Sequence, residues 1–294
     1  MPPAQSPLRG VALMMIAVAL YSIMDALVKG LAQIYHPFQV AFFRGLFALV
    51  PIGVMIGLRG GVGQLATRRI GGHAVRSAFG IVALLSFFYA FGHMKLADVV
   101  AIGFAAPLFI TALSVPMLGE RVGWRRWTAV VVGFLGVILI VDPGAGLLDP
   151  VALIALGAAL AYALAVVTIR RLAATESNAA IVFYFSVATA AVCGAMMPFL
   201  WISPTLEHMA LLILIGLLGG SAQYVMVEAF RWAPVSVLAP FDYTAIFWSL
   251  GFGYFIFGET SSAEMLVGVA IIAASGLYIL RRETVRARAP TANS

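Results

Sequence analysis

The chain has 294 residues, of which 63% are hydrophobic and only 10% are charged, and its formal net charge is +6. Soluble domains carry about 25% charged residues, so this composition excludes an ordinary soluble protein and indicates a membrane protein. The basic residues lie in short segments beside apolar runs, which does not indicate nucleic-acid binding, and the single Cys193 excludes a disulfide framework within the chain.

Apolar runs of about 20 residues, each long enough to cross about 30 Å of hydrocarbon as a helix, recur along the whole sequence. A transmembrane β-barrel would instead show short strands of alternating polarity. The sequence therefore predicts an all-α integral membrane protein with ten transmembrane helices. The predicted spans cover residues 10–29, 38–58, 74–92, 96–117, 126–142, 150–170, 178–200, 208–230, 235–257 and 263–281.

The positions of Lys and Arg predict which side of the membrane each loop faces. With the N-terminus in the cytoplasm, 15 of the 18 basic residues fall on the inner side, Arg76 among them. Lys29 and Lys95 fall outside, and Arg44 lies within a span. Because cytoplasmic loops carry the excess of basic residues, we expect both termini to be cytoplasmic. The expected location is the cytoplasmic (inner) membrane of a bacterium.

The two halves of the chain resemble each other. Ala90-Phe91 precedes an apolar run that ends with Leu118-Gly119-Glu120, and 139 positions later Ala229-Phe230 precedes a run that ends with Phe257-Gly258-Glu259. Each half holds five spans, so the second half enters the membrane from the opposite side.

This pattern predicts two inverted five-helix repeats, residues 1–145 and 146–284, followed by a disordered cytoplasmic tail at 285–294. Inverted repeats are typical of secondary transporters, which bind solute near the midplane where the repeats meet.

Charged residues inside the first two spans are candidates for solute binding, because a charge in the bilayer is costly. Asp25 lies towards the outer end of span 1, and Arg44 lies at a similar depth in span 2. They are expected either to pair with each other or to meet the charged ends of a zwitterionic or anionic solute. Lys29, one helical turn from Asp25, offers a surface pair as a further alternative.

Asp242 is a second candidate, about two turns inside span 9 and near Pro240, whose ring removes a backbone hydrogen bond. A carboxylate beside a broken helix is expected to line a polar cavity, bind an amine or take a proton, unless it is a core group bonded to a neighbouring tyrosine. Glu228 in span 8 is expected either to act in gating or to reach water beside Arg231. Asp25, Asp242 and Glu228 are the candidates for proton coupling.

Aromatic side chains are expected to supply the apolar walls of the site, although they are also ordinary packing residues. Pro107 in span 4 is expected to kink its helix and, like Pro240, to serve movement. The glutamates of the repeated Gly119-Glu120 and Gly258-Glu259 motif are expected to be structural, each capping the helix that follows. The aromatic candidates are Phe79, Tyr89, Tyr162, Tyr224, Tyr243 and Trp248.

The doubled Gly-Glu motif resembles that of the drug/metabolite transporter superfamily, in its EamA-domain branch. The residues that carry the resemblance are Leu118-Gly119-Glu120-Arg121 with Gly133 to Val137, and Phe257-Gly258-Glu259-Thr260 with Gly268 and Ser275-Gly276. Thr260-Ser261-Ser262 replaces the basic turn in the second copy, as an outer loop would require. The resemblance covers nearly the whole chain and implies a transporter of small organic solutes, including amino acids.

We therefore expect a secondary transporter that exports aromatic or apolar amino acids, or related metabolites, by alternating access. Uptake of a larger metabolite such as S-adenosylmethionine is the alternative that the resemblance also allows. A membrane enzyme is disfavoured because the four histidines are scattered and no Gly-x-Ser-x-Gly or Gly-x4-Gly-Lys motif occurs. A channel is a further alternative. No cofactor or metal is expected; the partners are the solute and the lipid bilayer, and one chain can enclose the cavity as a monomer.

Overall fold

The computed structural model describes residues 7–58, 61–118, 124–141, 149–173, 175–233, 238 and 241–288. Within these ranges every regular element is helical. Seven helical segments are long and apolar enough to cross a membrane, and three shorter apolar helices complete the set of ten. The predicted all-α membrane fold is confirmed.

The helix bounds agree with most of the predicted spans, but some differ. Span 4 is divided into α4 and α5, and span 7 into α8 and the short α9. In span 9 the helix α12 begins at Ala245 rather than at residue 235, and α13 continues to Arg288, so residues 285–288 of the predicted tail are helical. In chain order the elements are α1 (Pro7–Ala32), α2 (Pro37–Leu58), the 3-10 turn η1 (Val62–Leu65), α3 (Ile70–His93), α4 (Leu96–Gly103), α5 (Ala106–Leu118), α6 (Trp124–Val141), α7 (Pro150–Leu172), α8 (Asn178–Ala195), α9 (Met197–Leu200), α10 (Leu206–Trp232), α12 (Ala245–Phe257) and α13 (Ala263–Arg288).

Short polar residues fix where several of these helices begin. The side chain of Asp149 accepts a hydrogen bond from the Val151 amide, and Ser177 and Thr205 do the same at the starts of α8 and α10. Each bond satisfies an amide that the first helical turn leaves without a partner. Helix starts are therefore set by local sequence, and helix lengths by the apolar runs.

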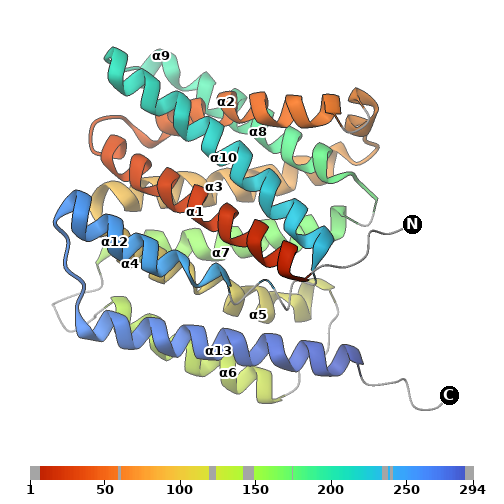
Figure 1. The fold of residues 1–294 in the computed structure, drawn as a ribbon, viewed down its shortest axis with the longest axis vertical. Helices are drawn as coiled ribbons and strands as arrows, with labels where there is room; N and C mark the ends of the chain where they lie inside the picture. Colours follow the sequence, from red (N-terminus) through yellow and green to blue (C-terminus); the bar gives the residue numbers. More distant parts are fainter. Residues whose placement is uncertain are drawn as a thin grey trace.

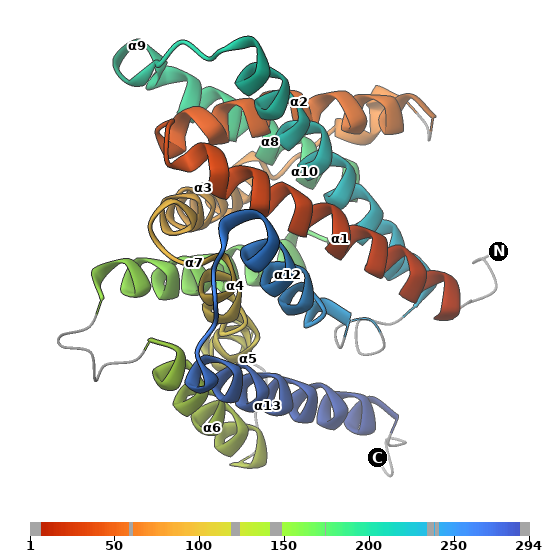
Figure 2. The same cartoon turned by 60° about the vertical axis from the view of Figure 1, so that its left-hand side comes forward.

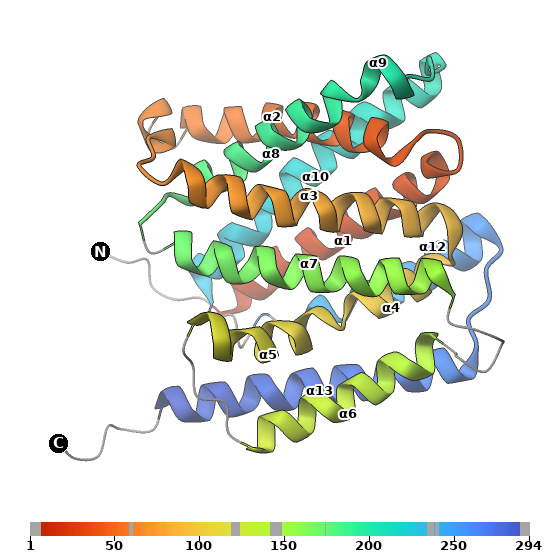
Figure 3. The ribbon, with the colours of Figure 1, turned by 180° about the vertical axis from the view of Figure 1, so that it is seen from behind.

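The two halves run through the bundle in opposite directions. α1 begins and α13 ends at the same end of the molecule, called the first end below (Figures 1 and 3). α7, which opens the second half, begins at the other, second end (Figure 3).

Packing between the halves follows the same relation. α1 packs on α10 and α3 packs on α7, so the first span of each half meets the third span of the other. α2 packs on α8, and α6 packs on α13 at one edge of the molecule (Figure 2). This reciprocal pattern is what inverted repeats about a pseudo-twofold axis require.

The fourth span of each half is broken at an equivalent place. The Ala105 amide donates to the Ile102 carbonyl at 2.9 Å, and 139 positions later the Thr244 amide donates to the Phe241 carbonyl at 3.1 Å. In the first half the break confirms the kink predicted at Pro107, which has no N–H to continue the helix ladder. The rings of Phe104 and Tyr243 meet edge to face, with centroids 4.9 Å apart. The two breaks thus lie together where the halves meet.

Hydrogen bonds join the halves at both ends of the bundle. At the second end, Tyr35 after α1 bonds His208 in the first turn of α10, Oη to Nδ1 at 2.8 Å. At the first end, Glu176 after α7 bonds His73 in the first turn of α3, Oε2 to Nε2 at 3.3 Å. These contacts occupy corresponding places in the two halves, so the repeat extends to individual polar contacts.

Candidate functional site

A buried arginine from α2 points into the bundle. Arg44 is 6% exposed, its guanidinium lies against Gly219 of α10, and its carbon Cζ is 5.8 Å from the ring centre of Phe185. Its Nε has no hydrogen-bond partner. Arg44 and Asp25 interact electrostatically, but no ion pair within 4.0 Å joins these two described side chains. The direct Asp25–Arg44 pair offered as one alternative is therefore not formed.

A second buried arginine contacts the same ring and was not among the predicted site residues. Arg76, near the start of the predicted span 74–92, was counted with the basic residues on the inner side, but α3 begins at Ile70, so Arg76 lies almost two turns inside the helix. It is 5% exposed, and its Cζ lies 3.7 Å from the ring centre of Phe185. Its Nε and Nη1 atoms have no hydrogen-bond partner. Phe185 of α8 therefore contacts both guanidinium groups.

Other polar groups continue this cluster towards the second half. Tyr21 of α1 interacts electrostatically with Arg44, Asp25 and Arg76, and also with Tyr162 of α7. Tyr162 in turn interacts with Asp242. Electrostatic interactions thus link four of the predicted site residues, Asp25, Arg44, Tyr162 and Asp242. We call these four residues, with Tyr21 and Arg76, the central polar cluster.

The residues around the break in span 9 lie near this cluster. Asp242 is exposed and lies in the helical turn before α12 rather than two turns inside a continuous helix. The hydroxyl of Tyr243 is buried without a hydrogen-bond partner and packs against Gly276 of α13. Pro240 lies outside the described residues.

The remaining predicted aromatic residues are more dispersed. Phe79 and Tyr224 are partly buried on α3 and α10. Tyr89 lies near the end of α3 and stacks on His93, with ring centres 4.1 Å apart. Trp248 is exposed on α12 and packs against Phe252. Tyr89 and Trp248 thus contact neighbours on their own helices.

Glu228 is held by its own helix. Its carboxylate accepts a hydrogen bond from the Trp232 indole at 3.1 Å. The guanidinium of Arg9 also lies over the ring of Trp232, with its carbon Cζ 3.9 Å from the ring centre. Glu228 therefore belongs to the contact between the start of α1 and the end of α10.

The motif residues of the second half tie the two halves together. Gly258 ends α12 with a positive φ of 65°, a conformation that favours glycine, and turns the chain so that Glu259 follows. Glu259 pairs with Lys29 of α1 at 2.8 Å and accepts a hydrogen bond from the Leu96 amide at 2.8 Å. Two predictions are corrected here. Lys29 does not pair with Asp25, and Glu259 caps α4 of the other half rather than α13.

An arginine of the second half contacts the first half at the first end. Arg171, near the end of α7, donates to the carbonyl of Met117, near the end of α5. Gly119 and Glu120, the motif residues of the first half, lie outside the described residues.

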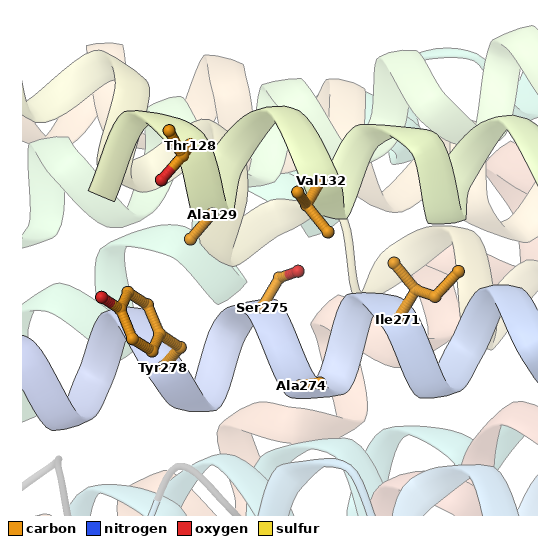
Figure 4. A pocket seen from close by; sticks show the side chains of 7 residues that line it. All are labelled: Thr128, Ala129, Val132, Ile271, Ala274, Ser275 and Tyr278. Atoms are coloured by element: carbon orange, nitrogen blue, oxygen red, sulfur yellow. The ribbon is translucent and has the colours of Figure 1, made fainter. Parts of the chain in front are cut away.

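An open hollow of about 360 Å³ lies elsewhere, between the first part of α6 and the middle of α13 (Figure 4). Its walls are mostly apolar, and none of the predicted site residues lines it. The lining residues are Thr128, Ala129, Val132, Ile271, Ala274, Ser275 and Tyr278. Because this hollow lacks charged groups and lies at the edge of the bundle, we place the candidate site at the central polar cluster. Among the described residues, no group of three or more His, Cys, Asp or Glu could hold a metal.

Comparison with known proteins agrees with this architecture. The EamA-like transporter family matches residues 8–142 and again residues 150–281. A solved crystal structure with 19% identity superposes over 95% of this chain and 99% of its own, with a TM-score of 0.66, which shows the shared fold.

Curated relatives cover the chain almost completely. A protein of Rickettsia bellii named S-adenosylmethionine uptake transporter is 29% identical over 93% of this chain and 94% of its own. The Pseudomonas aeruginosa pseudopaline exporter CntI is 29% identical over 92% of this chain and 96% of its own. With two family matches, a reciprocal helix arrangement and paired helix breaks, the chain belongs to the EamA-like transporter family and is a secondary transporter of small metabolites.

Proposed function

We propose that this protein exports amino acids, with aromatic or apolar side chains, or closely related metabolites, across a bacterial cytoplasmic membrane by alternating access. The observation that carries the proposal is the central polar cluster. It extends from Arg44 on α2 to Asp242 beside α12, and so joins the two halves. A zwitterionic solute carries one charge of each sign, which matches a site with arginine at one side and a carboxylate at the other.

The paired helix breaks support alternating access. Phe104 and Tyr243 meet at the breaks, and helices interrupted near the midplane are where inverted-repeat transporters bind their solutes. Aromatic side chains such as Tyr21 and Phe79 supply apolar contact area for a solute side chain. Both termini are proposed to be cytoplasmic.

Transport by the purified protein in liposomes tests the proposal. Vesicles loaded with radiolabelled phenylalanine, leucine or another apolar amino acid are expected to release it faster than protein-free vesicles, with saturation. The Asp242→Asn variant is expected to reduce this flux by about tenfold or more, since a charge-assisted hydrogen bond to the amine is lost. Glu264→Gln, at the exposed start of α13, is the matched control and should transport normally. Absence of flux for every amino acid, in both orientations, would remove this substrate class.

Uptake of S-adenosylmethionine is the second candidate, favoured by the relatives that carry that name. Competition separates the two: an excess of unlabelled S-adenosylmethionine should leave amino-acid flux unchanged if the first proposal holds. Flux with and without an imposed pH gradient then shows whether protons are coupled to transport.

A further inference from the structure

We propose that Arg44, Arg76 and Phe185 form a carboxylate-binding subsite, so that the transported solute must carry a carboxylate next to an apolar or aromatic group. The inference rests on the proposed function in assuming that the central polar cluster binds solute. It adds a residue, Arg76, that the sequence pattern counted only among the basic residues of the inner side, and it states which part of the solute is recognised and how.

Arg44 and Arg76 have guanidinium nitrogens without hydrogen-bond partners. Arginine stays protonated in proteins, and a buried guanidinium without partners is costly. Arg44 and Arg76 are 6% and 5% exposed, yet Arg44 Nε and Arg76 Nε and Nη1 have no hydrogen-bond partner. No described carboxylate lies within 4.0 Å of either group. Two like charges held together in this way are stabilised by an anion that accepts from both.

Glycines on the neighbouring helices make room for the two arginine side chains. A side chain at Gly80 would meet Phe185 at 2.8 Å and Arg76 Nη1 at 3.2 Å, and a side chain at Gly219 would meet Arg44 Nε at 3.3 Å. Gly80 and Gly219 are 139 positions apart, so they are equivalent in the two repeats. Each repeat thus has a glycine at the same place on its third span. Phe185 and Arg76 lie against Gly80, and Met24 and Arg44 lie against Gly219, so an arginine of the first half lies close to each glycine.

The surroundings of the two guanidinium groups favour one type of anion. The two guanidinium groups approach one ring, with Arg76 Cζ 3.7 Å and Arg44 Cζ 5.8 Å from the Phe185 centre. The central polar cluster holds two arginines and two carboxyl groups, and the Asp25 carboxyl interacts electrostatically with Arg44. A carboxylate brings one negative charge beside these carboxyl groups, whereas a phosphate dianion brings two, so a carboxylate fits better. Phe185 offers an apolar surface to the part of the solute that is attached to the carboxylate.

Access to this subsite comes from the Tyr162 side. Tyr162 is 45% exposed, and it interacts electrostatically with Arg76 and Asp242. A solute entering there can reach Arg76 with its carboxylate while its amine stays near Asp242.

Binding of small probe acids tests the subsite without relying on transport. A ligand that binds only the folded protein raises its melting temperature. Benzoate is expected to stabilise the purified wild-type protein, whereas benzamide, which has the same ring but no charge, should not. Phenyl phosphate, which is a dianion, should stabilise the wild-type protein less than benzoate does.

Arg76→Gln and Arg44→Gln should each weaken benzoate binding by about 10- to 100-fold, and Arg76→Lys by less. Arg68→Gln, in the exposed loop before α3, is the matched control and should bind normally.

The outcomes separate this inference from the proposed function. Equal effects of benzoate and benzamide on the wild type, or an unchanged benzoate response in folded Arg76→Gln, would overturn the subsite even if amino acids are transported. Benzoate binding that depends on both arginines, together with no amino-acid flux, would keep the subsite and reject the proposed substrate class. If Arg76→Gln does not fold, Arg76→Lys and the wild-type probe comparison still decide.

Discussion

Single buried charges in this protein differ in how they are balanced. Lys29 is 4% exposed and has a full set of partners: Glu259 at 2.8 Å and the carbonyls of Met94 at 2.5 Å and Phe91 at 3.4 Å. Arg44 and Arg76 are buried to the same extent but leave nitrogens without partners. A charge with complete partners holds structure, whereas a charge with incomplete partners is suited to receive a ligand.

Replacing Lys29 is therefore expected to reduce stability. Lys29→Met leaves the Glu259 carboxylate without its cation in a poorly solvated place, which should cost about 3 kcal/mol. Thermal unfolding in detergent measures the loss. Lys95→Met, at an exposed neighbour that donates only to the Thr260 carbonyl, is the control and should change little. The double variant Lys29→Met/Glu259→Gln should recover part of the loss; no recovery would contradict an ion pair at this position.

A second residue-scale prediction concerns acid. Glu176 lies in the turn between α7 and α8, and a hydrogen bond from Thr67, assisted by His73, holds the pKa of its carboxyl below the usual range against the opposing effect of burial. The folded state thus favours the ionised form. The resulting stability is fully present above the unfolded pKa of about 4.3 and is lost as pH falls through the lower folded value.

Glu176→Gln removes this titration. Its thermal stability should fall less steeply than that of the wild type when pH is lowered below about 4. Glu264→Gln should retain the wild-type slope. Parallel slopes for Glu176→Gln and wild type would show that the contact contributes nothing to pH dependence.

At the scale of helices, close approach of α2 and α10 depends on glycines of α10. A Cβ atom added at Gly216 would collide with Phe47, and one added at Gly220 would lie 2.8 Å from the Ala48 carbonyl oxygen and 2.7 Å from Pro51. Small residues allow such contact between membrane helices. The abundance of glycine in this span was visible in the sequence, but only the structure shows that α2 is the helix it faces.

Gly220→Ala is expected to push these helices apart and to cost about 1–3 kcal/mol, because backbone atoms of α2 cannot move aside easily. Gly53→Ala, on α2 itself, has no atom within 4 Å of the added carbon and serves as the control. Thermal unfolding of both variants checks the difference. Equal stability would mean that the two helices are not packed as described.

At the scale of the whole molecule, the inverted arrangement predicts that both chain ends lie on one side of the membrane. Cysteines placed at each terminus, in a Cys193→Ser background, should react with an impermeant thiol reagent only from the cytoplasmic side. Cys193 itself is buried. Reaction of the two termini from opposite sides would contradict an even number of spans.

The sequence predicted the helices well because length and apolarity decide them locally. It predicted the repeat because residues such as Gly258 and Glu259 recur at a fixed distance. It failed where a side chain depends on distant partners. Arg76 and Phe185 are 109 positions apart, and Glu259 meets Lys29 and Leu96 across the repeats. Arg76 lay inside the predicted span 74–92, but near its inner end, where basic residues are expected to face the cytoplasm.

The ion pair that joins the two halves has a consequence for direction. Two identical halves would leave the molecule indifferent between its inward-open and outward-open forms. Lys29 and Glu259 hold α1 and the end of α12 together at the second end, so opening that end must separate them. An energy difference of about 1.4 kcal/mol shifts such an equilibrium tenfold. The ion pair therefore favours the form of the empty carrier that is closed at the Lys29 end.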